Sequence, residues 1–249
     1  MRNLVLALTS FTALIVIWML ITGTGAVRPL FLPGPPKVLA TLYKTAMSGQ
    51  LAADLWISLW RIMIAFAMSC VVAIPGGIMI GSYKTASALV QPVVDFIRYM
   101  PVVAFVPLSI LWCGTGEWQK YVIIFVGTFF QQILMVQDCV KRVPKELVDV
   151  GRTLEMPEHQ IMLRIVLPAA APGIWDAMRT TLGWAWSWLV LAELVAANSG
   201  LGYRITVAQR YLQTDLIIGY VLLLGVLGLI TDQLMRGAEK RMFAYLGAQ

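Results

Sequence analysis

Residues 145–168 read KELVDVGRTLEMPEHQIMLRIVLP, a polar segment of mixed charge between long runs of strongly hydrophobic residues. It contains four acidic residues, three Lys or Arg residues and the single histidine of the chain. The apolar residues between positions 161 and 166 recur at helical spacing, and Pro157 is a typical starting residue for a short helix. We therefore predict a folded helical elbow outside the membrane, used as a docking surface for a soluble partner.

The composition around this elbow is that of a membrane protein. Of the 249 residues, 59% are hydrophobic and only 13% are charged, with a mean hydropathy of +0.77. A soluble domain has about 25% charged residues. The net charge of +6 is attributed to basic loops at the membrane and not to nucleic-acid binding. The three cysteines show no metal or disulfide spacing and are interpreted as packing residues.

Six membrane spans of roughly 20 residues each fit the hydropathy pattern. The stretch after the first span, TGTGAVRP, lacks a signal-peptide cleavage pattern, so a retained span is favoured. Residues 29–52 are Pro-rich and weakly amphipathic, which favours a position at the membrane interface. We predict an all-α membrane protein with one transmembrane domain over residues 1–249 and the elbow within 141–173. The spans are predicted at 4–22, 56–81, 92–113, 121–140, 174–197 and 216–235.

The distribution of Lys and Arg predicts the orientation. With the N-terminus inside the cell, the cytoplasmic side holds ten of these residues and the outer side six. Positive residues are enriched in cytoplasmic loops. This favours cytoplasmic N- and C-termini and places the elbow in the cytoplasm.

Helix-breaking residues occur inside two spans. Pro75-Gly76-Gly77 is predicted to interrupt the second span, and Pro101 and Pro107 the third. Broken backbone at membrane depth is tolerated only against other protein or a water-filled cavity. We therefore expect the spans to line a path, with kinked packing helices as the alternative. Asp95 and Arg98 share a helix face and are expected to pair.

No pattern for catalysis is present in the sequence. It contains no G-x-x-x-x-G-K-[ST] nucleotide loop, no Gly-x-Ser-x-Gly elbow, and no His, Cys and carboxylate cluster that would predict a metal site. We expect no enzyme activity from this chain. If transport is active, its energy must come from a partner or from an ion gradient.

The elbow resembles the cytoplasmic signature of bacterial ABC importer permeases, E-A-A-x3-G-x9-I-x-L-P. Asp149 stands at the Glu position, and Val150 and Gly151 cover the two Ala positions. Glu155 occupies the position of the usual turn glycine. The pattern closes in register with Ile165, Leu167 and Pro168.

Further segments are similar to the nitrate/sulfonate/taurine permease family, in order, over about residues 28–240. They are RPLFLPGPPKVL, SLWRIMIAF, IRYMPVVAFVPLSILWCGTGEWQK and LAELVAANSGLGY. The resemblance implies about six transmembrane helices in a type I ABC importer permease arrangement with a cytoplasmic coupling helix. It also implies a homodimer of permease subunits in the bacterial inner membrane, cytoplasmic ATPase subunits and an extracytoplasmic substrate-binding protein. ATP and Mg would bind to the ATPase, and no cofactor to this chain.

The substrate implied by the resemblance is a small anion. Taurine or another alkanesulfonate is the first hypothesis, and nitrate or bicarbonate the second. A self-contained secondary transporter or channel is the alternative from another class. It would show inverted repeats and paired broken helices, and the sequence shows no convincing repeat.

The resemblance assigns an ATPase-coupling role to residues of the elbow. The docking tip is expected to comprise eight consecutive residues, in which His159 is interpreted as an ordinary surface histidine. The full coupling set is Asp149, Gly151, Arg152, Thr153, Leu154, Glu155, Met156, Pro157, Glu158, His159, Ile165, Leu167 and Pro168.

Polar or helix-breaking residues in the spans are candidates for the translocation path. We expect Glu193 to brace the turn at residues 198–202 or to pair with Arg204. Arg61 is expected either to offer charge to an anion or to reach the interface or a carboxylate such as Asp54. The residues Trp184, Trp186 and Trp188 favour lipid and partner contacts, with an aromatic cage as the less favoured alternative. Gly77 and Gly81 indicate close helix packing. The candidate path residues are Arg98, Pro101, Pro107, Gln131, Gln132, Glu193 and Asn198. For the two glutamines, hydrogen bonding between helices is the alternative.

Overall fold

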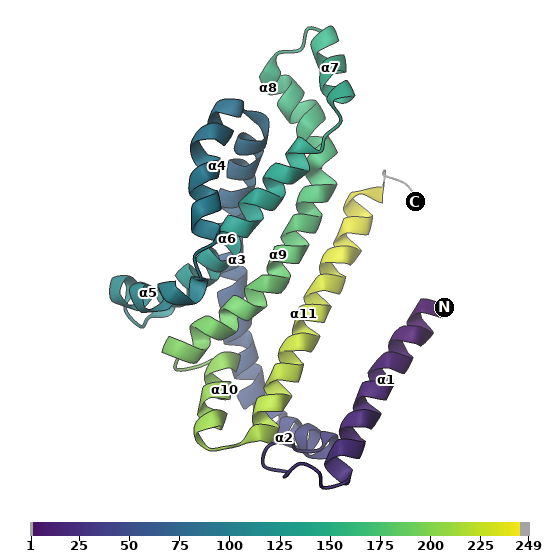
Figure 1. The fold of residues 1–249 in the computed structure, drawn as a ribbon, viewed down its shortest axis with the longest axis vertical. Helices are drawn as coiled ribbons and strands as arrows, with labels where there is room; N and C mark the ends of the chain where they lie inside the picture. Colours follow the sequence, from purple (N-terminus) through teal and green to yellow (C-terminus); the bar gives the residue numbers. More distant parts are fainter. Residues whose placement is uncertain (1, 245–249) are drawn as a thin grey trace. The chain divides into compact units, whose positions relative to one another are not determined.

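The computed structural model describes residues 2–244, and all regular structure in that part of the chain is helical (Figure 1). This confirms the predicted all-α class. The α-helices are α1 (Arg2–Gly23), α2 (Pro35–Met47), α3 (Gln50–Ser82), α4 (Lys84–Arg98), α5 (Phe105–Cys113), α6 (Glu117–Lys141), α7 (Lys145–Thr153), α8 (Glu158–Ile161), α9 (Leu167–Ala196), α10 (Leu201–Arg210) and α11 (Thr214–Met242). Two short elements join them, the 3-10 helix η1 (Val102–Ala104) and the π-helical turn η2 (Met162–Val166).

Four helices in the described residues are long and apolar enough to cross a membrane: α3, α6, the run Glu158–Ala196 and α11. The pair α4 and α5 adds a fifth candidate if this bent pair counts as one span. These helices occupy the predicted positions of spans two to six. Helix α1 lies at the position of the predicted first span, but its apolar stretch Thr9–Gly23 is shorter than the candidate spans named above.

The chain divides into two compact units. Unit 1 comprises residues 1–58 and 198–226, and unit 2 comprises residues 59–197 and 227–249. Residues 1 and 245–249 lie outside the described part of the chain. The predicted location of the two termini falls on these residues and stays a prediction.

The core of unit 2 forms where α6 lies along α9 (Figure 1). One apolar cluster at their elbow ends contains Val136 and Val140 of α6 with Ala170 and Ile174 of α9. Polar groups join α6 to α3 as well. Gln132 accepts a hydrogen bond from the Ser69 hydroxyl at 2.6 Å and donates to the sulfur of Cys70 at 3.1 Å. Gln132, a candidate for the path or for bonding between helices, therefore holds two helices together.

The predicted break at Pro75-Gly76-Gly77 is wrong, because α3 continues through all three residues. The reason is packing against α6. A Cβ atom on Gly77 would lie 2.6 Å from Cβ of Val136, and one on Gly81 would lie 2.8 Å from Cβ of Val140. The two glycines therefore let α3 approach α6 closely, as the small-residue spacing predicted. Tertiary packing holds the helix together around its internal proline.

The predicted break of the third span is half right. Helix α4 ends at Arg98, Pro101 caps η1, and α4 and the following η1–α5 segment are bent by 81°. The break therefore coincides with Pro101. Pro107 interrupts nothing, since it lies in the first turn of α5, where its missing N–H removes no helical hydrogen bond.

Unit 1 is held by contacts among residues far apart in the sequence. The hydroxyl of Thr41 in α2 donates to the Asp215 carboxylate at 2.8 Å. Gly219 allows α11 to lie against α2, because a Cβ there would meet the side chain of Leu42 at 2.8 Å. The predicted interfacial segment 29–52 therefore contains a helix, α2, that packs on α11.

The contact between α3 and α6 yields a prediction. Gly77→Ala places a methyl group against Val136 and within 2.7 Å of the Ile133 carbonyl oxygen, and that backbone atom cannot easily move. We expect a loss of stability of about 1–3 kcal/mol, measured by thermal unfolding of the detergent-solubilised protein. Gly225→Ala is the matched control, because nothing lies within 4 Å of its added methyl group. Equal stability of the two variants would contradict the packing account.

Candidate functional site

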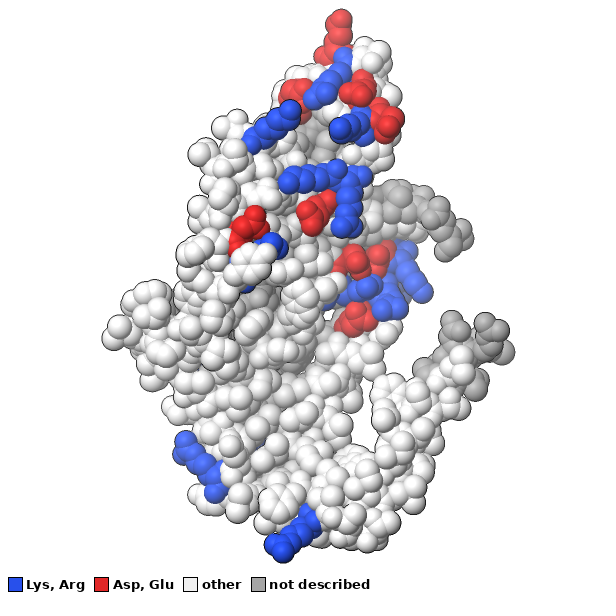
Figure 2. Space-filling view, in the orientation of Figure 1, with Lys and Arg blue, Asp and Glu red and all other residues white. Residues whose placement is uncertain are grey.

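The elbow is a helical hairpin that extends from α6 and α9 in unit 2. Helix α7 is followed by a turn at residues 154–157, and then by α8 and η2, which lead into α9. Figure 1 shows α7 and α8 side by side at the end of these two long helices. Figure 2 shows acidic and basic side chains gathered over the same elements. The predicted elbow is thus a folded structure with a charged surface.

The turn of the elbow closes α7 with a Schellman motif. The backbone N–H of Glu155 donates to the Arg152 carbonyl at 2.9 Å, and the N–H of Met156 donates to the Gly151 carbonyl at 3.0 Å. Glu155 has φ of +54°, the left-handed conformation usually occupied by glycine at this position. Among the non-glycine residues in the described range 2–244, only Glu155 and Leu212 have a positive φ. The turn therefore forms despite Glu155, at a cost in backbone strain.

The inner face of the elbow is tightly packed. A Cβ atom on Gly151 would lie 2.7 Å from Cδ1 of Ile165 and 3.1 Å from Cγ1 of Ile161, which is buried. Met156 packs against the same apolar cluster. Because these contacts cross between α7 and the α8–η2 segment, the hairpin is braced from within.

The outer face of the elbow carries an ion-paired surface around one exposed leucine. The guanidinium of Arg152 lies 3.5 Å from the Asp149 carboxylate and 3.3 Å from that of Glu158. Leu154, at the turn, is 68% exposed. An exposed apolar side chain surrounded by charges of both signs is suited to contact with a protein partner.

The structure separates the predicted coupling residues into two groups. Seven of the eight predicted tip residues are exposed, and the eighth, Met156, points into the packing of the hairpin. Asp149 and Pro168 are exposed, while Ile165 and Leu167 pack on the apolar cluster. The signature residues therefore include exposed residues on the surface of the elbow and apolar residues that pack beneath them.

A buried ion-pair network joins three long helices of unit 2. Arg61 of α3 is 2% exposed and donates to Glu117 of α6 and, at 2.9 Å, to Glu193 of α9. Glu193 is 1% exposed, whereas the side chain of Glu117 is about half exposed. Asp54, which the sequence offered as one alternative partner of Arg61, is not in these ion pairs, because the two carboxylates lie on α6 and α9.

Asp54 is the centre of a second network, in unit 1. Its carboxylate accepts hydrogen bonds from Arg204 at 2.9 Å, from the Tyr220 hydroxyl at 3.2 Å and from the backbone N–H of Gly200 at 3.3 Å. Hydrogen bonding to Asp54 raises the pKa of the Arg204 guanidinium, which keeps it charged. The partner expected for Arg204 was Glu193, but the observed one is Asp54. Within unit 1 it is Asp54, with Ser58, that braces the turn at residues 198–202.

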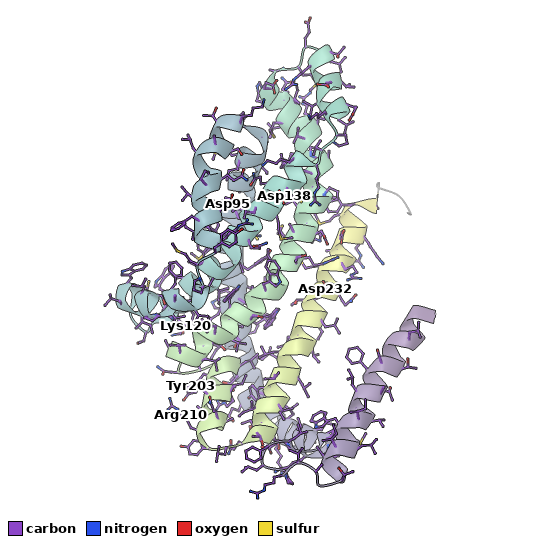
Figure 3. The ribbon with its side chains drawn as sticks, viewed as in Figure 1. Asp95, Lys120, Asp138, Tyr203, Arg210 and Asp232 are labelled. Carbon is purple, nitrogen blue, oxygen red and sulfur yellow. The ribbon has the colours of Figure 1, made fainter. Side chains whose placement is uncertain are left out.

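Two of the candidate path residues lie at one cavity. Arg98 and Gln131 both line it, and the expected ion pair of Arg98 with Asp95 is confirmed at 3.2 Å (Asp95 is labelled in Figure 3). Asn198 is an exposed residue directly after α9. Of the candidate residues, Gln132 and Glu193 hold helices together, and Arg98 and Gln131 line the same cavity, while the translocation path itself stays a prediction.

Sequence reasoning missed two features of α9. Trp184 and Trp188 are four residues apart, so they share a helix face and line the same cavity as Arg98. Trp186 does not line this cavity, and its indole N–H donates to the Thr231 hydroxyl of α11 at 3.2 Å. The second missed feature is Arg179, which pairs with Asp176, Asp232 and Glu239 and so connects α9 to α11 (Asp232 in Figure 3). The spacing of four residues between Trp184 and Trp188 was the sequence signal that could have predicted their shared helix face.

Long apolar helices, an exposed helical elbow and ion pairs between helices are the features of a multi-pass membrane protein. The chain belongs to the family of binding-protein-dependent transport system inner membrane components, whose model matches residues 73–244. Proteins of this family are the membrane permease components of ABC importers and are not themselves enzymes.

Related proteins extend this assignment over nearly the whole chain. A probable ABC transporter permease protein of Brucella melitensis biotype 1 is 37% identical, over 97% of both chains. A putative aliphatic sulfonates transport permease protein of Bacillus subtilis is 33% identical, over 93% of this chain and 84% of that protein. The fold resembles a chain of the MetNI methionine ABC transporter in an inward-facing crystal form. That match has a TM-score of 0.66 at 21% identity, over 82% of this chain and 99% of the other, and concerns the fold alone.

The buried network predicts an asymmetric response to mutation. Arg61→Leu leaves the buried Glu193 without this cation, so we expect a loss of about 3–5 kcal/mol in thermal unfolding. The double variant Arg61→Leu/Glu193→Leu is expected to recover part of that loss, because the buried charge is gone. Glu117→Gln is expected to cost less than Arg61→Leu, since Glu117 is half exposed. A double variant no more stable than Arg61→Leu would contradict the pairing.

The left-handed turn predicts that Glu155→Gly is tolerated. Glycine relieves strain in the folded turn but adds freedom to the unfolded chain, so we expect local stability to be unchanged or to rise by less than about 1 kcal/mol. Amide hydrogen exchange over residues 145–166 measures this. Glu146→Gly is the control, because in the first turn of α7 the substitution relieves no strain and removes an acidic side chain that is favourable near a helix N-terminus. Equal destabilisation by both substitutions would refute the role of the turn.

Proposed function

We propose that this chain is the membrane subunit of an ATP-driven importer of a small organic anion, with taurine or another alkanesulfonate as substrate. The elbow is the observation that carries the proposal, because it is a braced, charged docking surface on a chain that belongs to the family of importer permeases. The relative named for aliphatic sulfonate transport supports the choice of substrate. Nitrate or bicarbonate is the second choice.

The elbow is suited to transmit a movement. Helix α8, the π-helical turn and α9 follow one another without a loop, and the run Glu158–Ala196 qualifies as one 39-residue candidate span. Packing at Gly151 holds α7 against this run. A force on the tip would therefore move α9 as a rigid body, which is a known class of switching transition.

The proposal requires partners outside this chain. Two copies of the permease form the membrane channel, and ATPase subunits that bind ATP and Mg contact the elbow from the cytoplasm. An extracytoplasmic binding protein delivers the substrate from the other side. The proposed orientation places both termini of the chain in the cytoplasm of a bacterial cell. The excess of Lys and Arg on that side supports it.

Reconstitution tests the proposal. The permease is placed in proteoliposomes with the ATPase and the binding protein encoded beside it, and uptake of labelled sulfonate is measured with and without ATP. We expect uptake only with ATP, and faster ATP hydrolysis when substrate-loaded binding protein is present. Uptake by the permease alone, driven by an ion gradient, would instead identify a secondary transporter.

A charge exchange on the elbow separates docking from folding. In Arg152→Glu/Glu158→Arg the internal ion pair can reform with its signs reversed, and such an exposed pair is worth only about 0.2–1 kcal/mol. We expect the elbow to keep its hydrogen-exchange protection while the ATPase co-purifies at a reduced level, because the partner now faces the wrong charges. Normal assembly and normal uptake in this variant would count against Arg152 and Glu158 as docking residues.

A further inference from the structure

A cavity of about 410 Å³ lies in unit 2, where the end of α4, η1 and α5 meet α6 and α9. Its volume falls in the range typical of small-molecule sites. Three polar side chains line it, from three different helices: Arg98, Gln131 and Ser187. The other lining residues are glycine, aromatic or aliphatic. A mostly apolar cavity with a few convergent polar groups is the usual form of a ligand site.

The polar groups of this cavity are available to a ligand. Within residues 2–244 the structure records no hydrogen bond from the side chains of Gln131 or Ser187. Arg98 uses Nε towards Asp95 and Nη2 towards the Tyr99 hydroxyl, at 2.9 Å. A guanidinium has five N–H donors, so donors remain. In contrast, no carboxylate lines the cavity among the described residues, so an ammonium group would find only neutral acceptors and aromatic rings there and would share the cavity with the Arg98 guanidinium.

The apolar part of the cavity has a fixed aromatic wall. The ring of Trp188 lies directly over Gly127 of α6, where an added Cβ would come within 2.4 Å of it. Trp184 lies one turn away on the same face of α9. A neighbouring cavity of about 460 Å³ shares five apolar lining residues with the first and is itself lined by apolar side chains and Ser109. A second cavity with an apolar lining therefore lies next to the first.

We infer that this cavity is a substrate-binding site within the permease itself, and that it selects organic monoanions with an uncharged apolar body. Arg98, Gln131 and Ser187 hold the anionic group, and Trp184 and Trp188 enclose the hydrocarbon. The inference rests on the proposed import function and narrows its substrate from taurine and other alkanesulfonates to alkanesulfonates without an amino group, which excludes taurine. The permease then adds a selection of its own to that of the binding protein.

Two nearly isosteric ligands test the selectivity. Taurine and 1-propanesulfonate differ by an ammonium group in place of a terminal methyl group. Their binding to the assembled complex in nanodiscs, without binding protein or nucleotide, is measured by isothermal titration, with empty nanodiscs as a blank. We expect 1-propanesulfonate to bind at least about ten-fold more tightly, because burying an ammonium group away from water without a carboxylate to neutralise it, beside the Arg98 cation, is unfavourable. Each further methylene, up to hexanesulfonate, should strengthen binding about three- to four-fold.

Substitutions in and near the lining test whether the ligand binds in this cavity. Arg98→Gln is expected to weaken 1-propanesulfonate binding about ten-fold or more, and Asp95→Asn to strengthen it, because the competing carboxylate is removed. Gly127→Ala displaces Trp188 and should reduce the gain per methylene. Gly183→Ala, on α9 with nothing within 4 Å of the added methyl group, should leave binding unchanged. Thermal unfolding of each variant confirms that it is folded.

The outcomes separate this inference from the proposed function. Absence of 1-propanesulfonate binding, equal or tighter binding of taurine, or wild-type binding by both Arg98→Gln and Gly127→Ala would overturn the inference. If ATP-driven sulfonate uptake by the reconstituted complex persists in those cases, the proposed function stands without the intramembrane site. If no anion tested stimulates ATP hydrolysis through the binding protein, the proposed function itself is wrong.

Discussion

Close contact of α6 with its neighbours is the constraint on which the structure of unit 2 depends. In a membrane the hydrophobic effect does not drive helices together, so association relies on van der Waals contact and interhelical polar bonds. Gly77 and Gly81 let α3 lie against α6, and Gly127 lets the Trp188 ring of α9 lie against it from another side. Hydrogen bonds from the Ser69 hydroxyl to Gln132 and from Gln132 to the sulfur of Cys70 also hold α3 and α6 together. With these contacts α6 and α9 form a closely packed helix pair, here called the stiff pair.

This stiff pair positions both functional features. The elbow follows α6 and leads back into α9, so the proposed docking surface is held by two helices that pack extensively on each other. The cavity of Arg98 and Gln131 lies along the same two helices, beside the break at Pro101. The ion pairs of Arg61 with Glu117 and Glu193 tie α3, α6 and α9 together as well. A displacement of the elbow would thus reach the cavity through packed helices, with no flexible segment between α8 and α9.

Sequence reasoning located the helices and the elbow but not the polar partners. Hydropathy and proline spacing are local signals, and they placed the spans and the break at Pro101. The continuity of α3 through Pro75 could not be predicted, because it depends on how Val136 and Val140 of a distant helix pack on two glycines. The pairing of Arg61 with Glu193 and of Asp54 with Arg204 was missed for the same reason. From the sequence, several carboxylates could have paired with each arginine, and only the fold shows which of them lies close enough. The turn at Glu155 was located by the family signature, while its left-handed geometry needed the structure.

The most direct test of the account is a contact measurement at the tip of the elbow. A photo-reactive amino acid at Leu154, the exposed side chain at the turn, is introduced into the complex in its native membrane, and the crosslinked partner is identified by mass spectrometry. Leu163, also exposed but outside the predicted tip, serves as the comparison position. The account predicts a crosslink from position 154 to the ATPase subunit that changes in yield when ATP is added. A crosslink to lipid alone, or one to the extracytoplasmic binding protein, would contradict it.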